Sequence, residues 1–462
     1  MNAQPENTRL PKVCIVGAGC SGFTTAKRLK DYGIPFDCYE MSDDIGGNWY
    51  YKNPNGASAC YESLHIDTSK WRLAFEDFPI PEDFPDFPHH AQLQQYFKDY
   101  VAHFGLRPHI TFNTEVTEAK RTGDGLWAVT LSTGETKLYD ALVVANGHHW
   151  DPRMPEFLGA FEGDEMHVHA YCDPFDPIDM RGKNIVVVGM GNSAMDVACE
   201  LSQKPIAKRL MMAARRGVYV IPKYHKGEPL DKASAPAWMP LKLQKALGRY
   251  AVKKIIGDQT RLGMPQPDHR PLDAHPTVSS EFAIRLGSGD IEIKPNIEAK
   301  LGRQVRFTDG SVEDVDVIIY ATGYNVSFPF LKDEAVKVEN NHVSLFKRMM
   351  RPGVPNLFFM GLAQALPTLV NFAEQQSKLV AKYLAGKYAL PSEEEMWRMT
   401  KADEALYTGN FYNSARHTMQ LDFPHYVRQL MKEIAKGEAR AKKQGGKLPV
   451  PARAEEAKQK AA

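Results

Sequence analysis

Residues Lys12–Gly22 have the sequence K-V-C-I-V-G-A-G-C-S-G, and this stretch decides the fold. Its first five residues form a short apolar run that is typical of a buried parallel strand. A glycine-rich turn follows, and apolar side chains then recur at helical spacing up to Tyr32. A second strand-like run, Pro35–Tyr39, leads to Glu40. The order of strand, glycine loop, helix, strand and acid predicts a βαβ unit that binds a dinucleotide.

The three glycines of this loop have separate tasks. Gly17 permits the tight turn, Gly19 lets a pyrophosphate approach the backbone, and Gly22 lets helix and strand pack closely. The phosphates then face the free N–H groups at the positive end of the helix. Glu40 can accept hydrogen bonds from ribose hydroxyls, but its carboxylate would repel a 2′-phosphate. We therefore expect this half to hold FAD or NAD rather than NADP.

A similar unit begins after residue 180. The strand-like run Asn184–Val188 leads into G-M-G-N-S-A, and a helical run follows. The next strand-like run, Arg209–Ala214, is followed by Arg215 and Arg216, where the first unit has an acid. A guanidinium group binds phosphate bidentately and stays charged, so this site is predicted to prefer NADPH to NADH. The cofactor-binding residues expected in this loop are Gly189, Gly191, Asn192, Ser193 and Ala194.

Two further segments connect the units. Ala141–Gly147, A-L-V-V-A-N-G, and Val317–Tyr324, V-I-I-Y-A-T-G-Y, each lead from a strand into a tight turn. We interpret them as the places where the chain crosses between two domains. The predicted fold is α/β, with two Rossmann-like dinucleotide-binding domains and the NADP domain inserted in the FAD domain.

The expected domain limits follow from these crossings. The NADP-binding domain is expected to carry an insertion that is rich in Pro, Lys and His, with a helical run over Leu241–Ile256. Composition dominated by Lys, Ala, Glu, Gly and Gln predicts a disordered end of the chain. The limits are 1–175 for the first part of the FAD-binding domain, 176–315 for the NADP-binding domain with its insertion at 218–276, 316–440 for the return to the FAD-binding domain, and 441–462 for the tail.

The segment F-E-G-D-E-M-H-V-H-A-Y narrows the function. It resembles the fingerprint of class B flavoprotein monooxygenases, with Phe161, Gly163, His167 and Tyr171 at the positions of the motif. G-G-N-W at 46–49, D-F-P at 77–79 and the A-T-G-Y motif are also similar to that family. The Baeyer–Villiger group typically has Trp at the last fingerprint position, so Tyr171 favours the flavin-containing monooxygenases.

The resemblance implies a sequence of steps. NADPH reduces FAD and NADP stays bound, then oxygen adds to the flavin as a C4a-hydroperoxide, and a soft nucleophile takes the distal oxygen. The substrate would be an amine nitrogen or a sulfide sulfur, and the protein would exclude water from the cleft. The resemblance adds Gly47, Asn48, Trp49, Thr68 and Tyr324 to the expected cofactor-binding residues. It also suggests a homodimer.

One position departs from the family pattern. Where members typically carry Asn beside the flavin, this chain has Asp67, which we expect to be a catalytic residue. An amide can donate a hydrogen bond to an anionic flavin or to NADP, whereas an ionised carboxylate cannot. One hypothesis is that Asp67 is protonated in the reduced complex, or that it turns toward a donor such as Thr68 or Lys70. The other is that the enzyme loses more hydrogen peroxide.

Composition excludes several other classes. The formal net charge is +1, which predicts neither a nucleic-acid nor a membrane partner, and no apolar stretch is long enough to cross a bilayer. The six cysteines lack metal-ligand spacing, which favours a reducing, cytoplasmic location. His167 and His169 form an H-x-H pair without a third ligand at suitable spacing, so no metal is expected.

Three alternatives remain. A Baeyer–Villiger oxygenase would use the same cofactors on a ketone. A pyridine-nucleotide disulfide reductase would need a close pair of redox cysteines, and the chain has neither C-x-x-C nor C-x-x-x-x-C. A non-catalytic NADPH sensor would lack a flavin.

Overall fold

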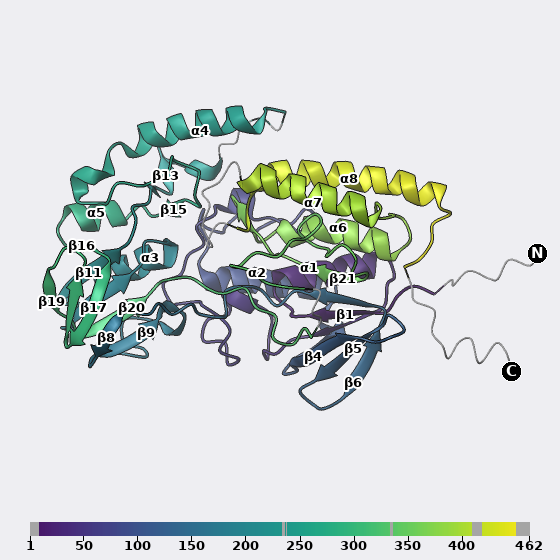
Figure 1. Cartoon of the computed structure of the whole chain (residues 1–462), viewed down its shortest axis with the longest axis horizontal. Coiled ribbons are helices and arrows are strands. Elements are labelled where there is room, and N and C mark those ends of the chain that lie inside the picture. Colours follow the sequence, from purple (N-terminus) through teal and green to yellow (C-terminus); the bar gives the residue numbers. More distant parts are fainter. Residues whose placement is uncertain (1–8, 233–235, 237, 333–335, 409–417, 450–462) are drawn as a thin grey trace, which may run out of the picture.

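The computed structural model describes residues 9–232, 236, 238–332, 336–408 and 418–449. It has two lobes, each built on a five-stranded parallel sheet (Figure 1). The first sheet has the strand order β21-β7-β1-β2-β3. In that order its strands are Leu357–Phe359, Ala141–Val144, Val13–Val16, Phe36–Tyr39 and Ile110–Thr111.

Alternation along β1 places the first core on both faces of this sheet. Val13 and Ile15 pack with the helices α1 (Cys20–Asp31), α2 (His90–His103) and α6 (Phe372–Leu384). Cys14 and Val16 point to the opposite face, where they pack with Trp127. That face is covered by the antiparallel strands β4 (Val116–Arg121), β5 (Trp127–Leu131) and β6 (Thr136–Tyr139), which lie below the sheet in Figure 1.

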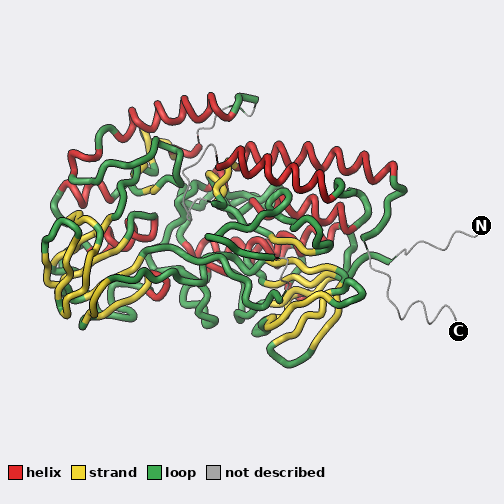
Figure 2. The backbone as a smooth tube through the Cα atoms, viewed as in Figure 1, coloured by secondary structure: helices red, strands yellow, loops and turns green. Residues whose placement is uncertain are grey.

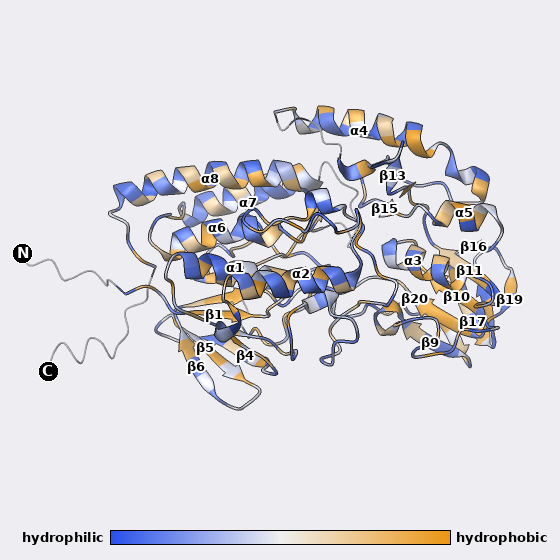
Figure 3. Cartoon of the chain, turned by 180° about the vertical axis from the view of Figure 1, so that it is seen from behind, coloured by the Kyte–Doolittle hydropathy of each residue, from blue (hydrophilic) through white to orange (hydrophobic). Residues whose placement is uncertain are grey.

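The second sheet has the order β16-β11-β10-β20-β9. One face is covered by the helices α3 (Asn192–Leu201) and α5 (Phe282–Gly287), and the other by a four-stranded sheet, β19-β18-β17-β8. Figure 2 shows these strands gathered in one lobe, and in Figure 3 the central parallel strands β10 and β20 are coloured hydrophobic. The parallel strands are Glu292–Pro295, Arg209–Ala214, Asn184–Val188, Val317–Tyr320 and Asp164–His167, and the covering strands are Val312–Asp314, Gln304–Phe307, Ile297–Gly302 and Leu158–Phe161.

Strand pairing moves the expected limits of the second unit. Both β9 and β20 pair in parallel with neighbours in the second sheet, although they fall outside the range 176–315. The sheet needs them because β10 would otherwise lack a neighbour on that side. Val326 already packs in the first lobe. We therefore propose crossings at about 145–157 and 321–326.

The insertion covers the cleft between the lobes. It contains β12 (Val220–Ile221), β13 (Tyr224–His225), β14 (Glu228–Pro229) and α4 (Leu241–Ile256), and β12 pairs with β15 (Thr277–Val278). Helix α4 has the bounds predicted from the sequence, because Pro240 precedes it and Gly257, with φ of 64°, ends it. The backbone N–H of Ser69 donates to Asp231 Oδ2 at 2.8 Å, which joins the insertion to the first lobe.

The end of the chain returns to the first lobe. The strands β22 (Gln364–Leu366) and β23 (Gln420–Asp422) pair there, followed by α8 (Phe423–Lys443), while α7 (Glu393–Thr408) lies between them in the sequence. The prediction of a disordered tail from residue 441 is wrong up to residue 449. Helix α8 continues to Lys443, and Asn356 Nδ2 donates to the Pro449 carbonyl at 2.8 Å. Residues 450–462 lie outside the described part.

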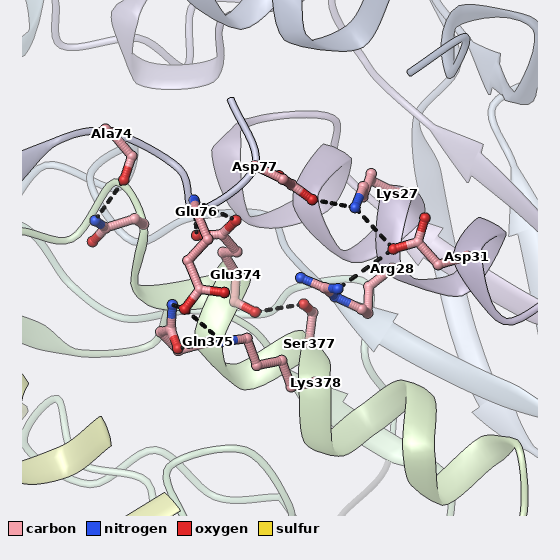
Figure 4. A network of polar contacts seen from close by, with 11 residues as sticks. Lys27, Arg28, Asp31, Ala74, Glu76, Asp77, Glu374, Gln375, Ser377 and Lys378 are labelled. Carbon is pink, nitrogen blue, oxygen red and sulfur yellow. Dashed lines mark hydrogen bonds and ion pairs between the residues drawn. The ribbon is translucent and has the colours of Figure 1, made fainter. Parts of the chain in front are cut away.

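A polar network fastens the segment 74–77 to α1 and α6 (Figure 4). Lys27 on α1 forms an ion pair with Asp77, and Lys378 on α6 donates to Glu76 Oε1 at 2.6 Å. Glu374, only 1% exposed, accepts from the backbone N–H of Glu76 at 3.1 Å. This segment follows the loop that lines the cleft, so the network holds one cleft wall in place.

The replacement Glu374→Gln is expected to remove part of the pH dependence of stability. Burial raises the pKa of Glu374 to about 7. Between its usual pKa near 4.5 and about 7, the folded state binds a proton that the unfolded state does not, so the contribution of Glu374 to stability falls as pH rises. A glutamine keeps an acceptor for Glu76 without the titration.

Unfolding of both holoenzymes by urea at about pH 5 and about pH 8 measures this effect. The free energy of unfolding of the variant minus that of the parent should be larger at about pH 8 than at about pH 5. A difference between the two proteins that stays constant with pH would contradict the assignment.

Candidate active site

A single cleft of about 2020 Å³ lies between the lobes. Both glycine loops open into it, and the insertion contributes residues to its wall. The carboxyl ends of β1 and β10 therefore both line this cleft. Open parallel sheets bind ligands at the carboxyl ends of their strands.

The two loops have the same geometry. Gly17 has φ of +97°, and a Cβ there would lie 2.7 Å from the carbonyl oxygen of Ala145, directly after β7. Gly189 has φ of +129°, and its Cβ would lie 2.5 Å from the carbonyl oxygen of Ala321, directly after β20. Only glycine fits at either position. The crossing strands thus abut the loops that we expect to bind dinucleotides.

Gly19 precedes the first residue of α1, and Gly22 lies in its first turn. The free N–H groups at this helix start face the cleft. Glu40 follows β2 and is buried, which raises its pKa. Its Oε2 accepts from the Ala18 backbone N–H at 2.7 Å, and its Oε1 accepts from that of Ser42 at 2.8 Å. Each oxygen keeps a lone pair for a ribose hydroxyl, so these residues fit a dinucleotide without a 2′-phosphate.

The G-G-N-W motif packs against the first glycine loop. A Cβ on Gly19 would lie 3.7 Å from Gly47 Cα, and residues Gly47–Trp49 form one turn of 3₁₀ helix. Asn48 Oδ1 accepts from the backbone N–H of Ala59 at 2.9 Å. Thr68 is buried, and its hydroxyl donates to the Pro367 carbonyl at 2.8 Å. Gly47, Asn48, Trp49 and Thr68 all line the cleft.

The second loop leads into α3. Gly191 precedes this helix, and Asn192, Ser193 and Ala194 form its first turn and line the cleft. Asn192 Oδ1 accepts from the Val278 backbone N–H at 3.0 Å, which ties the loop to β15. The helix start is again open to a phosphate.

Arg215 and Arg216 follow β11, and both are exposed at the wall of the cleft. Arg216 Nε lies 3.6 Å from Asp268 Oδ2 of the insertion. Two guanidinium groups at the end of this strand fit the 2′-phosphate that distinguishes NADP from NAD.

Two fingerprint residues make hydrogen bonds to other parts of the second lobe. His167 contacts the second crossing, and Tyr171 contacts α3. His167 Nδ1 accepts from the His169 backbone N–H, so Nε2 carries the proton and donates to the Gly323 carbonyl at 3.1 Å. Burial lowers the pKa of His167 to about 4, which keeps it neutral. The hydroxyl of the buried Tyr171 donates to Glu200 Oε2 at 2.8 Å.

The other two fingerprint positions have packing roles. Phe161 packs on the core of the second lobe, and Gly163 has no room for a side chain, because its Cβ would lie 2.5 Å from the Asp316 carbonyl oxygen. Tyr324 lies at the second crossing, with its ring 5.4 Å from that of His149 and 5.2 Å from that of His167, and it lines the cleft.

Asp67 faces a partner that the sequence did not indicate. Lys223 Nζ of the insertion lies 3.3 Å from Asp67 Oδ1. The expected donors are otherwise engaged, since Thr68 donates to Pro367 and Lys70 Nζ donates to the Glu82 carbonyl at 2.8 Å. The prediction of Thr68 or Lys70 as donor is therefore wrong, because backbone carbonyls are nearer to both. Partial burial raises the pKa of Asp67, and Lys223 opposes that rise.

Sequence reasoning also missed Asp196, which contacts a tyrosine of the first lobe. Tyr61 is buried, and its hydroxyl donates to Asp196 Oδ2 at 2.6 Å. Asp196 lies on α3 four residues after Asn192, so both point to one side of the helix. That helical spacing from the glycine loop was the available signal.

The histidine pair, the cysteines and the helices of the described part are further candidate functional features. His167 and His169 contact different carbonyls, those of Gly323 and Gly56, and no group of three possible metal ligands occurs among the described residues. All six cysteines, which lie in the described part, are free. No helix within the described ranges is long and apolar enough to span a bilayer.

A family model described as flavin-binding monooxygenase-like matches residues 10–440. The chain belongs to this family. It is therefore a flavin-binding oxidoreductase, as the resemblance implied. Family membership favours a monooxygenase over the disulfide reductase and the non-catalytic sensor.

Two curated relatives and one solved structure illustrate the similarity. Flavin-containing monooxygenase 5 of Rattus norvegicus is 35% identical over 436 residues, covering 89% of this chain and 80% of the relative. Dimethylaniline monooxygenase [N-oxide-forming] 2 of the same species is 34% identical over 446 residues, covering 92% and 82%. The crystal structure of OTEMO in complex with FAD and NADP has a TM-score of 0.73 at 19% identity, covering 93% of this flavin monooxygenase and 99% of that chain.

Proposed function

We propose that the first glycine loop binds FAD and the second binds NADPH. The loop at 17–22 ends beside Glu40, which suits a ribose, and the loop at 189–194 lies near Arg215 and Arg216, which suit a 2′-phosphate. Both open into one cleft, and this is the observation that carries the proposal. A nicotinamide bound at one loop can thus reach a flavin bound at the other.

We further propose that the enzyme transfers one oxygen atom from O2 to the nitrogen of an amine or the sulfur of a sulfide. Bound FAD, once reduced by NADPH, supplies the activation of O2. The N-oxide in the name of the rat relative supports a soft nucleophile as substrate.

The residues of the chain position the reactants and exclude water. The insertion covers the cleft and is fixed to the first lobe through Asp231, and Arg72 Nε donates to the Asp231 carbonyl at 2.8 Å. Asp67, with Lys223 beside it, is the charged group of this wall that we assign to catalysis. Such closure favours oxygen transfer over release of hydrogen peroxide.

NADPH oxidation with trimethylamine, a thioether and a cyclic ketone tests the substrate class. An amine or sulfide should gain an oxygen atom and suppress peroxide release. A lactone from the ketone, with neither N-oxide nor sulfoxide formed, would overturn this proposal in favour of Baeyer–Villiger chemistry. The enzyme is further proposed to be a cytoplasmic homodimer, which fractionation and analytical ultracentrifugation test.

A further inference from the structure

Four polar side chains line the cleft as two contacting pairs. Tyr61 and Asp67 belong to the first lobe, Asp196 lies in the second turn of α3, and Lys223 belongs to the insertion. Tyr61 donates to Asp196 at 2.6 Å, and Lys223 lies 3.3 Å from Asp67. We call these four residues the cleft cluster. Its members come from both lobes and from the insertion, and all four line the cleft into which both glycine loops open.

The cleft cluster has an excess of negative charge when both of its acids are ionised. It then contains two carboxylates and one ammonium group. Tyr61 adds no charge, because burial raises the pKa of its hydroxyl well above the usual value. Such an excess of negative charge on partly buried groups is relieved when one proton binds.

The charged groups around the cleft cluster also favour the binding of one proton. Glu200, one turn further along α3, adds negative potential at Asp196. His65 does not compensate, because partial desolvation and the neighbouring His89 and Lys223 lower its pKa. The pKa of Asp196 is accordingly raised to about 7, first by burial and then by the carboxylate of Asp67.

We propose that Asp67 and Asp196, held by Tyr61 and Lys223, bind one proton between them, and that this proton is released to solvent when oxidised NADP binds. Asp196 is thus a positioning residue that sets the charge of Asp67. With the proton, Asp67 can act as a hydrogen-bond donor, as an amide would at that position. Without it, the cleft cluster carries a negative charge that attracts a cation.

Oxidised NADP supplies such a cation. Its phosphates suit the second glycine loop and the two arginines, which leaves its positively charged nicotinamide ring for the part of the cleft beside the first lobe. No bond other than that to the proton changes, and the proton passes to the buffer. Linkage requires the affinity for oxidised NADP to rise with pH, by up to about tenfold per pH unit below the titration.

The test is calorimetric titration of oxidised NADP into the FAD-loaded enzyme, in buffers of different ionisation enthalpy, from about pH 6 to pH 8.5. There is no turnover, so the result depends on cofactor binding and not on the proposed oxygen transfer. The parent should release up to about half a proton more than Asp196→Asn near pH 7, where the free enzyme is half protonated, and more at lower pH. Asp179→Asn, an exposed acid of the same lobe outside the cleft, should behave like the parent.

Two further variants should shift the pH of proton release in a predicted direction. A purely structural role of Asp196 would not produce this shift. Tyr61→Phe removes a donor to the Asp196 carboxylate, and Lys223→Met removes the nearby positive charge, so both should shift the release to higher pH. Asp196→Glu restores a carboxyl group and should restore the release.

Equal proton release by the parent and Asp196→Asn at every pH would overturn the proposal. Infrared difference spectra of the unmutated holoenzyme give an answer even if a variant does not retain FAD. A protonated-carboxyl band should disappear when oxidised NADP is added, and the absence of such a change would also overturn the proposal.

Discussion

The double variant Arg215→Gln/Arg216→Gln is expected to bind NADPH about 100- to 200-fold more weakly than the parent. A charge-assisted hydrogen bond to phosphate contributes about 1.5–3 kcal/mol. Both arginines are exposed, so screening favours the lower end for each. NADH lacks the 2′-phosphate, so its KM should change little.

The measurement is the KM for each nucleotide in oxygen-dependent oxidation by the FAD-loaded enzyme. Arg181→Gln is a matched control, because Arg181 is an exposed arginine of the same lobe that pairs with Asp179 and does not line the cleft. Equal losses for NADPH and NADH in the double variant would show that these arginines do not bind the 2′-phosphate.

The variant Gly17→Ala is expected to bind FAD about 10- to 100-fold more weakly. Its left-handed backbone costs an alanine about 1–2 kcal/mol, and the new Cβ would lie 2.7 Å from the Ala145 carbonyl oxygen. Since about 1.4 kcal/mol is tenfold in affinity, the strain and the contact together give this range.

The absorbance ratio of flavin to protein, followed by titration of the apoprotein with FAD, measures the loss. Gly123→Ala adds a methyl group with no atom within 4 Å and serves as the control. Gly189→Ala should do the opposite of Gly17→Ala, with FAD retained and oxidised NADP bound weakly. If Gly17→Ala kept FAD and lost NADP, the two loops would have to exchange their assignments.

Local sequence patterns predicted much of the architecture. The glycine loops lie at the ends of β1 and β10, and the A-N-G and A-T-G turns follow β7 and β20. These features are local, because a strand, a turn with positive φ and a helix start are each encoded within a few neighbouring residues. Helix α4 was predictable for the same reason, since Pro240 and Gly257 flank its apolar pattern.

Contacts across the lobes were not predictable in this way. Asp67 and Lys223 are far apart in the sequence, and neither residue type indicates the other. The membership of β9 and β20 in the second sheet is likewise a matter of pairing, which depends on how the crossings fold back. The contact between Asp67 and Lys223 depends on tertiary structure, whereas the conformation of a glycine loop is determined by its own residues.

We propose that this flavin monooxygenase transfers one atom of O2 to a soft nucleophile and consumes NADPH in doing so. Oxidation of NADPH under ¹⁸O2, with trimethylamine or a thioether present and peroxide titrated in the same sample, tests it most directly. The account predicts one labelled oxygen in the N-oxide or sulfoxide for each NADPH consumed, with peroxide suppressed by the substrate. NADPH oxidation that produces only peroxide with every amine and sulfide tried, or product oxygen that carries no label, would contradict it.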